Sequence, residues 1–371
     1  MDDHKRGCRI KPGQAAILAL AALATLVSCE RAPEYVIGFT ASLSGVDYLL
    51  GTEGRNAAEL YVAKLNQEGG IRGHTVRLEA RDHAGDLGAL QGILRGLKDA
   101  GALAVIGAYT SAEAETALPV LAELELPLVS PSATAASLSG KRDWLWRTIM
   151  SGEWDAEVLA RLMDQEGLGT LLVVASSRNR AYVNTYVQPL DAQGKVEALL
   201  VFDRPEQLDC APYIQVASFD AILIIGNSME SAAVAQELRA NGCAKPLFVS
   251  GWAGNVEFVR YGGASAEGAR FVHQVDADHP GLEELKNDYF RVYGEEPGFS
   301  AIETWESLQF LCLALEGWSR GQVSLRQALE AISSFEGPTG TIIMDVNGDA
   351  KRPMYIKEVR SGNIVVVGRI D

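Results

Sequence analysis

The sequence predicts an α/β protein built from two doubly wound lobes, each with a mainly parallel sheet. Short apolar segments of strand length alternate with longer segments of helical periodicity, and this alternation runs twice along the chain. Strands that alternate with helices form parallel sheets that helices cover on both faces. The length of 371 residues is also enough for about two domains.

The first alternation covers residues 35–130. Strands are expected over 35–39, 76–80, 104–107 and 128–130, and helices over 55–67, 87–100 and 113–124. Apolar residues at helical spacing favour the first of these helices, and Gly69-Gly70 ends it. The segment 104–107 is short and apolar throughout, which is typical of a strand buried on both faces.

The second alternation covers residues 154–250. Strands are expected over 171–175, 196–202, 221–225 and 247–250, and helices over 154–166, 181–190, 212–217 and 230–240. Further helices are expected over 282–293, 301–318 and 324–333, and strands with a turn at Asn347-Gly348 over 340–370. Ligands of open parallel sheets bind beyond the carboxyl ends of the strands, so the loops at those ends are the candidate site.

The first 28 residues have the layout of a secretory signal. Basic residues precede a predominantly apolar run over 15–27, which at 13 residues is shorter than a membrane-spanning helix of about 20. The run ends in Leu26-Val27-Ser28-Cys29, which resembles a bacterial lipobox. That resemblance implies that residues 1–28 are removed and that Cys29 carries a lipid anchor, with residues 29–34 as a tether. An ordinary signal peptide with a chance cysteine is the alternative.

Charge and cysteine content exclude several classes of function. The net charge of −15 argues against a nucleic-acid partner, because nucleic acids attract basic surfaces. No cysteine pair has the C-x-x-C spacing of a zinc or redox site. We expect Cys210, Cys243 and Cys312 to be buried free thiols. A disulfide between Cys210 and Cys243 is the alternative.

The motifs of catalysis and of cofactor binding are missing from the sequence. It has no G-x-S-x-G, H-E-x-x-H, G-x-x-x-x-G-K-[ST] or G-x-G-x-x-G motif. The five histidines are scattered, with no pair at the spacing of metal ligands. The sequence therefore predicts a binding protein that is not an enzyme and needs neither cofactor nor metal.

Several loops at the predicted strand ends carry a recognisable series of motifs. In chain order these are Ser42-Leu43-Ser44-Gly45, Gly51, Asn66 to Gly73, Asp82, Gly107 to Ser111, Ser130 to Thr134, Phe335 to Thr341 and Asp345 to Asp349. Together they resemble the leucine/isoleucine/valine-binding protein family of type 1 periplasmic binding proteins, which serve ABC transporters. The resemblance extends over residues 35–371.

This resemblance implies a domain division and a location. Three crossovers between the lobes form a three-strand hinge, and the ligand bridges the lobes. We expect lobe 1 to comprise 35–150 plus 277–352, and lobe 2 to comprise 151–276 plus 353–371. The protein is then exported to the periplasm or cell surface, where it delivers a solute to an ABC permease.

Two loops of lobe 1 are candidates for binding a carboxylate. Ser111 lies where a helix begins, and free backbone N–H groups and the positive end of the helix dipole capture anions there. Ser132-Ala133-Thr134 offers a second set of donors at the next strand end. The resemblance implies that these two segments hold the carboxylate of the ligand. Helix capping alone is the alternative function of the serines.

In lobe 2 the chain departs from the family it resembles. Tyr182 falls where the family has a ligand-facing tyrosine, with a surface aromatic as the alternative. At the two positions of acids that pair with an amino group, the chain has Gly152 and Trp252, and only Glu153 could substitute, shifted by one residue. A buried ammonium without an anion is strongly unfavourable.

The ligand expected from these residues is a small carboxylate-bearing molecule. It is either an amino acid or an aromatic or apolar organic acid, and the missing acids favour the organic acid. Tyr109, Tyr182 and Trp252 would form an aromatic wall around it. Two other functions stay open: a lipoprotein that signals ligand binding to a receptor or kinase, and a degenerate lipoprotein that binds nothing.

Overall fold

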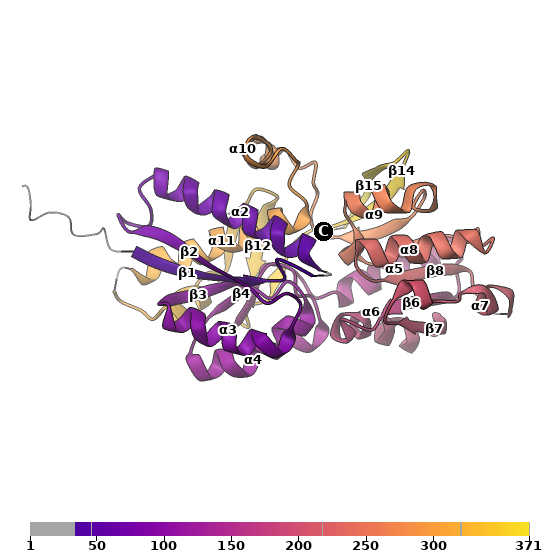
Figure 1. Cartoon of the computed structure of the whole chain (residues 1–371), viewed down its shortest axis with the longest axis horizontal. Helices are drawn as coiled ribbons and strands as arrows, with labels where there is room; N and C mark the ends of the chain where they lie inside the picture. The colour runs from indigo at the N-terminus through magenta and orange to yellow at the C-terminus, as the bar shows by residue number, and fades with distance from the viewer. Residues whose placement is uncertain (1–33, 46, 217, 320, 371) are drawn as a thin grey trace, which may run out of the picture.

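The computed structural model describes residues 34–370 apart from 46, 217 and 320, and shows two α/β lobes side by side (Figure 1). The predicted signal peptide, Cys29 and most of the tether lie outside these residues. Within the described part of the chain, no helix is long and apolar enough to cross a membrane.

The sheet of lobe 1 has five parallel strands in the order β2-β1-β3-β4-β5. These are β1 (Glu34–Ala41), β2 (Thr75–Asp82), β3 (Ala102–Gly107), β4 (Leu128–Ser130) and β5 (Leu145–Arg147). Its connecting helices are α2 (Tyr48–Gln67), α3 (Leu87–Asp99) and α4 (Ser111–Leu124), followed by the short helix η1 (Ala136–Leu138). In Figure 1, α2 lies on one side of this sheet and α3 and α4 on the other.

The sheet of lobe 2 has seven strands in the order β15-β14-β10-β9-β8-β6-β7. These are β6 (Leu171–Ser176), β7 (Val196–Phe202), β8 (Ala221–Ile225), β9 (Leu247–Val249), β10 (Arg270–His273), β14 (Met354–Arg360) and β15 (Asn363–Ile370). Strands β14 and β15 are antiparallel, and the others are parallel. The α/β prediction with mainly parallel sheets is therefore confirmed, with an antiparallel edge that the sequence did not predict.

The helices of lobe 2 lie between its strands. They are α5 (Glu153–Gln165), α6 (Arg180–Ala192), η2 (Pro205–Gln207), α7 (Ala211–Val216), α8 (Ser228–Ala240), η3 (Gly251–Ala253), α9 (Val256–Gly262) and η4 (Gly263–Ser265). Each of the four predicted helices between 154 and 240 is present within two residues of its predicted ends.

The chain then adds helices and a small third sheet before its last two strands. These are η5 (Pro280–Leu282), α10 (Glu283–Tyr293), α11 (Phe299–Trp318) and α12 (Leu325–Glu330), with β11 (Ser334–Gly337), β12 (Gly340–Met344) and β13 (Ala350–Lys351). The three strands pair antiparallel in the order β11-β12-β13. Helix α11 packs along α2, which places this part of the chain with lobe 1.

The chain passes between the two large sheets three times: after β5, after β10 and between β13 and β14. Side chains bond these crossovers together. The amide of Gln274 in the second crossover both accepts from the Met150 N–H at 2.7 Å and donates to the Met150 carbonyl at 3.3 Å in the first. Arg352 in the third donates to the Thr148 carbonyl in the first at 3.3 Å. The lobe boundaries at 150/151, 276/277 and 352/353 stay a prediction with which these sheets agree.

The two lobes also touch away from the crossovers. The Asn227 amide, at the start of α8, donates to the Asp47 carboxylate, just before α2, at 2.9 Å. The backbone N–H of Ala136 donates to the Thr185 hydroxyl on α6 at 3.1 Å. These contacts hold the lobes in a closed arrangement.

Helix α2 begins at Tyr48, seven residues before its predicted start at Arg55. Gly51 and Gly54 weaken helical propensity, which displaced the prediction. The structure shows why they are there: a Cβ on Gly51 would lie 2.1 Å from the Ser42 carbonyl oxygen, and one on Gly54 would lie 2.1 Å from the Tyr109 hydroxyl. Only glycine allows the helix this close to the strand-end loops.

Cys210, Cys243 and Cys312 are buried free thiols, as predicted, and the alternative disulfide is not formed. Burial raises the pKa of the Cys210 thiol to about 11 and that of the Cys312 thiol to about 12. Thiols with raised pKa values carry little thiolate at neutral pH and are poor nucleophiles.

Candidate functional site

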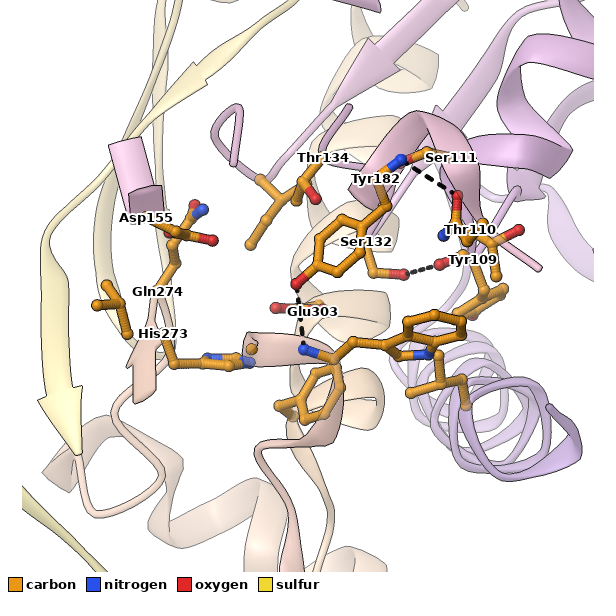
Figure 2. Close-up of a pocket in the computed structure, with 17 residues that line it drawn as sticks. Tyr109, Thr110, Ser111, Ser132, Thr134, Asp155, Tyr182, His273, Gln274 and Glu303 are labelled. Carbon is orange, nitrogen blue, oxygen red and sulfur yellow. Dashed lines mark hydrogen bonds between the residues drawn. The ribbon is translucent and has the colours of Figure 1, made fainter. Parts of the chain in front are cut away.

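A pocket lies between the lobes, at the carboxyl ends of their strands (Figure 2). Its lining comes from both lobes and from the crossovers: Leu50, Tyr109, Thr110, Ser111, Ser132, Thr134, Ile149, Asp155, Asn179, Tyr182, Gly251, Trp252, Val272, His273, Gln274, Phe299 and Glu303. Six of the eight predicted ligand-binding residues are in this set. Ala133 and Glu153 are not.

The beginning of α4 supplies open hydrogen-bond donors on the lobe 1 side. Thr110 caps the helix by accepting from the Glu113 N–H at 3.2 Å, and the Glu113 carboxylate in turn accepts from the Tyr109 N–H at 2.7 Å. The Tyr109 amide is therefore already occupied. The N–H groups of Ser111 and Ala112 have no acceptor among the described residues, so they remain open for an anion.

Two hydroxyls add further donors, one at the start of α4 and one in the loop after β4. The Ser111 hydroxyl accepts from the Ala135 N–H at 3.0 Å, which leaves its own proton to donate. The Thr134 hydroxyl is buried and has no partner among the described residues. A buried hydroxyl without a partner is costly, and a bound acceptor would remove that cost.

Ser132 lines the pocket and Ala133 does not. The Ser132 hydroxyl lines the pocket but donates to the Tyr109 carbonyl at 2.8 Å, so its proton is in use. The Ala133 N–H donates to the Ser130 hydroxyl at 3.1 Å, and its methyl packs in a core cluster of lobe 1. Ala133 therefore supports the loop and does not face the pocket.

Aromatic side chains form the middle of the pocket. The rings of Tyr182 and Trp252 meet edge to face with centroids 5.8 Å apart, and the Trp252 backbone N–H donates to the Tyr182 hydroxyl at 3.3 Å. Tyr109 also lines the pocket, although its hydroxyl bonds to that of Thr304 at 2.6 Å. The predicted aromatic residues are thus brought together, and Tyr182 is a buried lining residue instead of a surface aromatic.

Glu153 is not the acid of this pocket. It is exposed at the start of α5, where its carboxylate accepts from the Ser151 hydroxyl at 3.3 Å. The acid that lines the pocket is Asp155, two residues further on. Its carboxylate accepts from the Tyr186 hydroxyl at 3.0 Å through one oxygen. Burial raises the Asp155 pKa to about 7.

A second acid, Glu303 of α11, also lines the pocket and was missed in the sequence. It is 2% exposed, and no described residue donates to its Oε2 atom. Burial raises its pKa well above the ordinary value; the positive charges of Arg352 and Lys357 oppose this shift, and the negative charges of Glu306 and Asp155 add to it. The pocket thus has two buried acids, which come from other positions than Gly152 and Trp252 and were not predicted.

His273, from β10, completes the polar lining next to Gln274. Its Nδ1 atom accepts from the Val275 N–H at 3.0 Å, which places the proton of the neutral ring on Nε2. Burial and the nearby cations Lys357 and Arg352 hold the His273 pKa well below its usual range. His273 therefore adds no positive charge to the pocket.

One sequence signal could have found Glu303, and none was specific for Asp155. Helix α11 is rich in apolar residues, so acids near its start, Glu303 among them, need an explanation. Asp155 stands in an ordinary first helical turn, where acids are common because of the helix dipole. Among the described residues, no cluster of His, Cys, Asp and Glu side chains has the arrangement of a metal site.

Comparisons with known proteins agree with this architecture. The chain is 27% identical over 278 residues to the Leu/Ile/Val-binding protein BraC3 of Rhizobium johnstonii, covering 72% of this chain and 74% of that protein. Its fold superimposes with a TM-score of 0.80 on the branched-chain amino acid transporter substrate binding protein LivJ of Streptococcus pneumoniae, solved with isoleucine, at 20% identity with 91% and 98% of the chains covered.

A benzoate complex of an ABC transporter solute-binding protein from R. palustris also has a TM-score of 0.80, at 18% identity with 91% and 96% of the chains covered. A sequence model of the family described as periplasmic binding protein matches residues 34–363. The family indicated by the strand-end motifs is thereby confirmed. The chain belongs to the periplasmic binding protein family, whose members are extracytoplasmic solute-binding proteins and not enzymes.

Proposed function

We propose that this protein captures a small carboxylate-bearing solute between its lobes and delivers it to an ABC permease. The observation that carries the proposal is the set of unoccupied donors at one end of the pocket: the N–H groups of Ser111 and Ala112 and the hydroxyls of Ser111 and Thr134. No lysine or arginine lines this pocket, so backbone dipoles and hydroxyls are what it offers to an anion.

The pocket also bears on which carboxylates are favoured. Related proteins have been solved with isoleucine and with benzoate, so both amino acids and aromatic acids are reasonable candidates. Asp155 and Glu303 line the pocket and could pair with a positively charged group of the solute, which the sequence did not predict. We therefore favour an amino acid over an aromatic or apolar acid.

Isothermal titration with a panel of amino acids and aromatic acids tests the proposal. Replacing Ser111→Ala or Thr134→Val should weaken the binding of whichever carboxylate the wild type takes by about 10–100-fold, because each removes a hydrogen bond to a charged group. Ser137→Ala is the matched control, since Ser137 is exposed in the same region. Equal affinities in all four proteins would contradict the site.

We further propose that residues 1–28 are cleaved and that Cys29 is acylated, so that the protein is held at the membrane surface by lipid. The support is the lipobox resemblance of Leu26 to Cys29. Metabolic labelling with a fatty acid should mark the wild-type protein. Cys29→Ser should abolish the label and release the protein from the membrane fraction, and a labelled Cys29→Ser protein would contradict the anchor.

A further inference from the structure

We propose that Asp155 and Glu303 bind a cationic group of the solute, and that this group lies at the far end of the solute from its carboxylate. The inference deepens the proposed function and rests on it, because the carboxylate is taken to lie at the start of α4. The solute class is then a zwitterion with separated charges, such as an amino acid with a basic side chain or an ω-amino acid.

Asp155 is a buried acid with an open acceptor. It is 5% exposed, and the Tyr186 hydroxyl bonds its Oδ2 atom at 3.0 Å, while its Oδ1 atom has no partner among the described residues. Tyr186 in turn accepts from Tyr182 at 3.2 Å. This chain of tyrosines holds one carboxylate oxygen in place and leaves the other to accept from a ligand.

Glu303 differs from its neighbour one turn further along α11. Glu306 is equally buried, yet its carboxylate accepts from Arg352 at 2.7 Å and from the Thr339 hydroxyl. No described residue donates to the Oε2 atom of Glu303. Glu306 is therefore paired within the protein, whereas Glu303, which lines the pocket, has an oxygen open to a ligand.

Among the described residues, no cation contacts these two acids directly. No arginine or lysine lines the pocket. Arg352 and Lys357 favour the ionised form of Glu303 from a distance, but Arg352 is paired with Glu306, and neither cation forms an ion pair with Asp155 or Glu303. Two buried acids without a counter-charge are strongly disfavoured in their ionised forms. An ammonium or guanidinium of the solute would pair with both.

The two acids belong to different lobes, since Asp155 is on α5 and Glu303 is on α11. A cation held by both therefore bridges the lobes and favours the closed arrangement. Figure 2 shows Asp155, Gln274 and His273 on one side of the Tyr182 ring and Thr110 and Ser111 on the other. A solute that reaches both groups carries its positive charge away from its carboxylate.

Matched solutes that differ only in the distal amine test the inference. Lysine is compared with norleucine, and 5-aminovalerate with valerate, by isothermal titration at pH 8. In the wild type, we expect the distal amine to strengthen binding by at least tenfold in each pair. Asp155→Asn and Glu303→Gln should remove this advantage, and Glu157→Gln on α5, whose side chain is 45% exposed and does not line this pocket, should keep it.

The possible results separate this inference from the proposed function. Equal binding of lysine and norleucine to the wild type overturns the cation site and needs no variant that has to fold. If Ser111→Ala still weakens both solutes in that case, the carboxylate site stands. If lysine and 5-aminovalerate fail to bind while leucine or an aromatic acid binds through Ser111, the cation site is again overturned and the proposed function is kept.

Discussion

Asp155 and Glu303 are acids whose burial has a cost in the ligand-free protein. Removing an ionised carboxylate from water is unfavourable unless hydrogen bonds or a counter-charge replace the lost hydration. The Oδ1 atom of Asp155 and the Oε2 atom of Glu303 have no partner among the described residues, whereas the Oδ2 atom of Asp155 accepts from Tyr186. Such groups are typical of functional sites, where a bound ligand supplies the missing hydrogen-bond donor or counter-charge.

The pH dependence of stability should report this cost. The Asp155 pKa is raised from 3.8 to about 7 in the folded protein. The folded state therefore binds this proton more tightly than the unfolded state, and stability falls as the pH rises from about 4 to about 7. Asp155→Asn removes this contribution. The free energy of unfolding of the variant, relative to that of the wild type, should therefore be higher at pH 8 than at pH 5 by on the order of 2–4 kcal/mol.

Urea unfolding of the ligand-free wild type and the variant at pH 5 and pH 8 measures this difference. Because the Asp155 charge raises the pKa of Glu303, the variant also changes the titration of Glu303, and the comparison reports the two neighbouring acids together. Wild type and Asp155→Asn curves that shift in parallel between the two pH values would show that Asp155 does not have a raised pKa.

At this scale, the sequence predicted several residues that line the pocket but neither of its two buried acids. Ser111, Thr134, Tyr182 and Trp252 could be placed because they lie at strand or helix ends in recognisable motifs. Asp155 and Glu303 are 148 positions apart in the numbering and come from different lobes. The two acids line the same pocket because the lobes pack together, and a local sequence pattern cannot predict that packing.

At the scale of single elements, helix α2 shows how a close contact can override helical propensity. Gly54 lies inside the helix, where glycine costs about 1 kcal/mol relative to alanine. The space beside it is filled by the Tyr109 ring, whose hydroxyl bonds Thr304 of α11. The glycine therefore allows α2, the loop after β3 and α11 to meet beside the pocket.

Gly54→Ala should destabilise the protein by about 1–3 kcal/mol, although alanine is the better helix former, because its Cβ would displace Tyr109. Gly92→Ala in α3 is the matched control, since a Cβ there meets nothing within 4 Å. We expect that control to stabilise by about 0.5–1 kcal/mol. Denaturant unfolding measures both, and a gain in stability for Gly54→Ala would contradict the contact.

Two of the strands that the sequence missed, β5 and β10, are short. Strand β5 has three residues and β10 has four, which is too short to show a clear pattern. Both are held by neighbouring strands, β5 by β4 and β10 by β9 and β14. By contrast, β7 and β8 were predicted with their observed bounds, because longer apolar runs stand between clear turn signals.

At the scale of the whole molecule, few polar contacts away from the crossovers hold the lobes together. They include the bond from Asn227 to Asp47 and that from the Ala136 N–H to Thr185. Polar bonds of this kind contribute about 0.5–1.5 kcal/mol each. An equilibrium between closed and open arrangements held by such contacts can be shifted by the binding energy of a small solute.

Removing both contacts should open the ligand-free protein. Asp47→Ala removes no helix cap, since the Asp47 side chain does not cap α2, and Thr185→Val keeps the size of the side chain. We expect the double variant to have a larger radius of gyration by small-angle X-ray scattering, and a weaker affinity for its solute. Asp191→Ala, exposed on α6, is the control, and scattering curves identical to the wild type would show that other contacts maintain closure.

The bonds between Met150 and Gln274 have a mechanical consequence. Gln274 and its neighbour His273 belong to the passage between lobes and at the same time form a wall of the pocket. A solute that contacts this wall lies next to the hinge and far from the outer edges of the lobes. A small difference in solute length would then produce a larger difference in the distance between the outer edges of the lobes. A transporter could distinguish solutes by the resulting angle between the lobes.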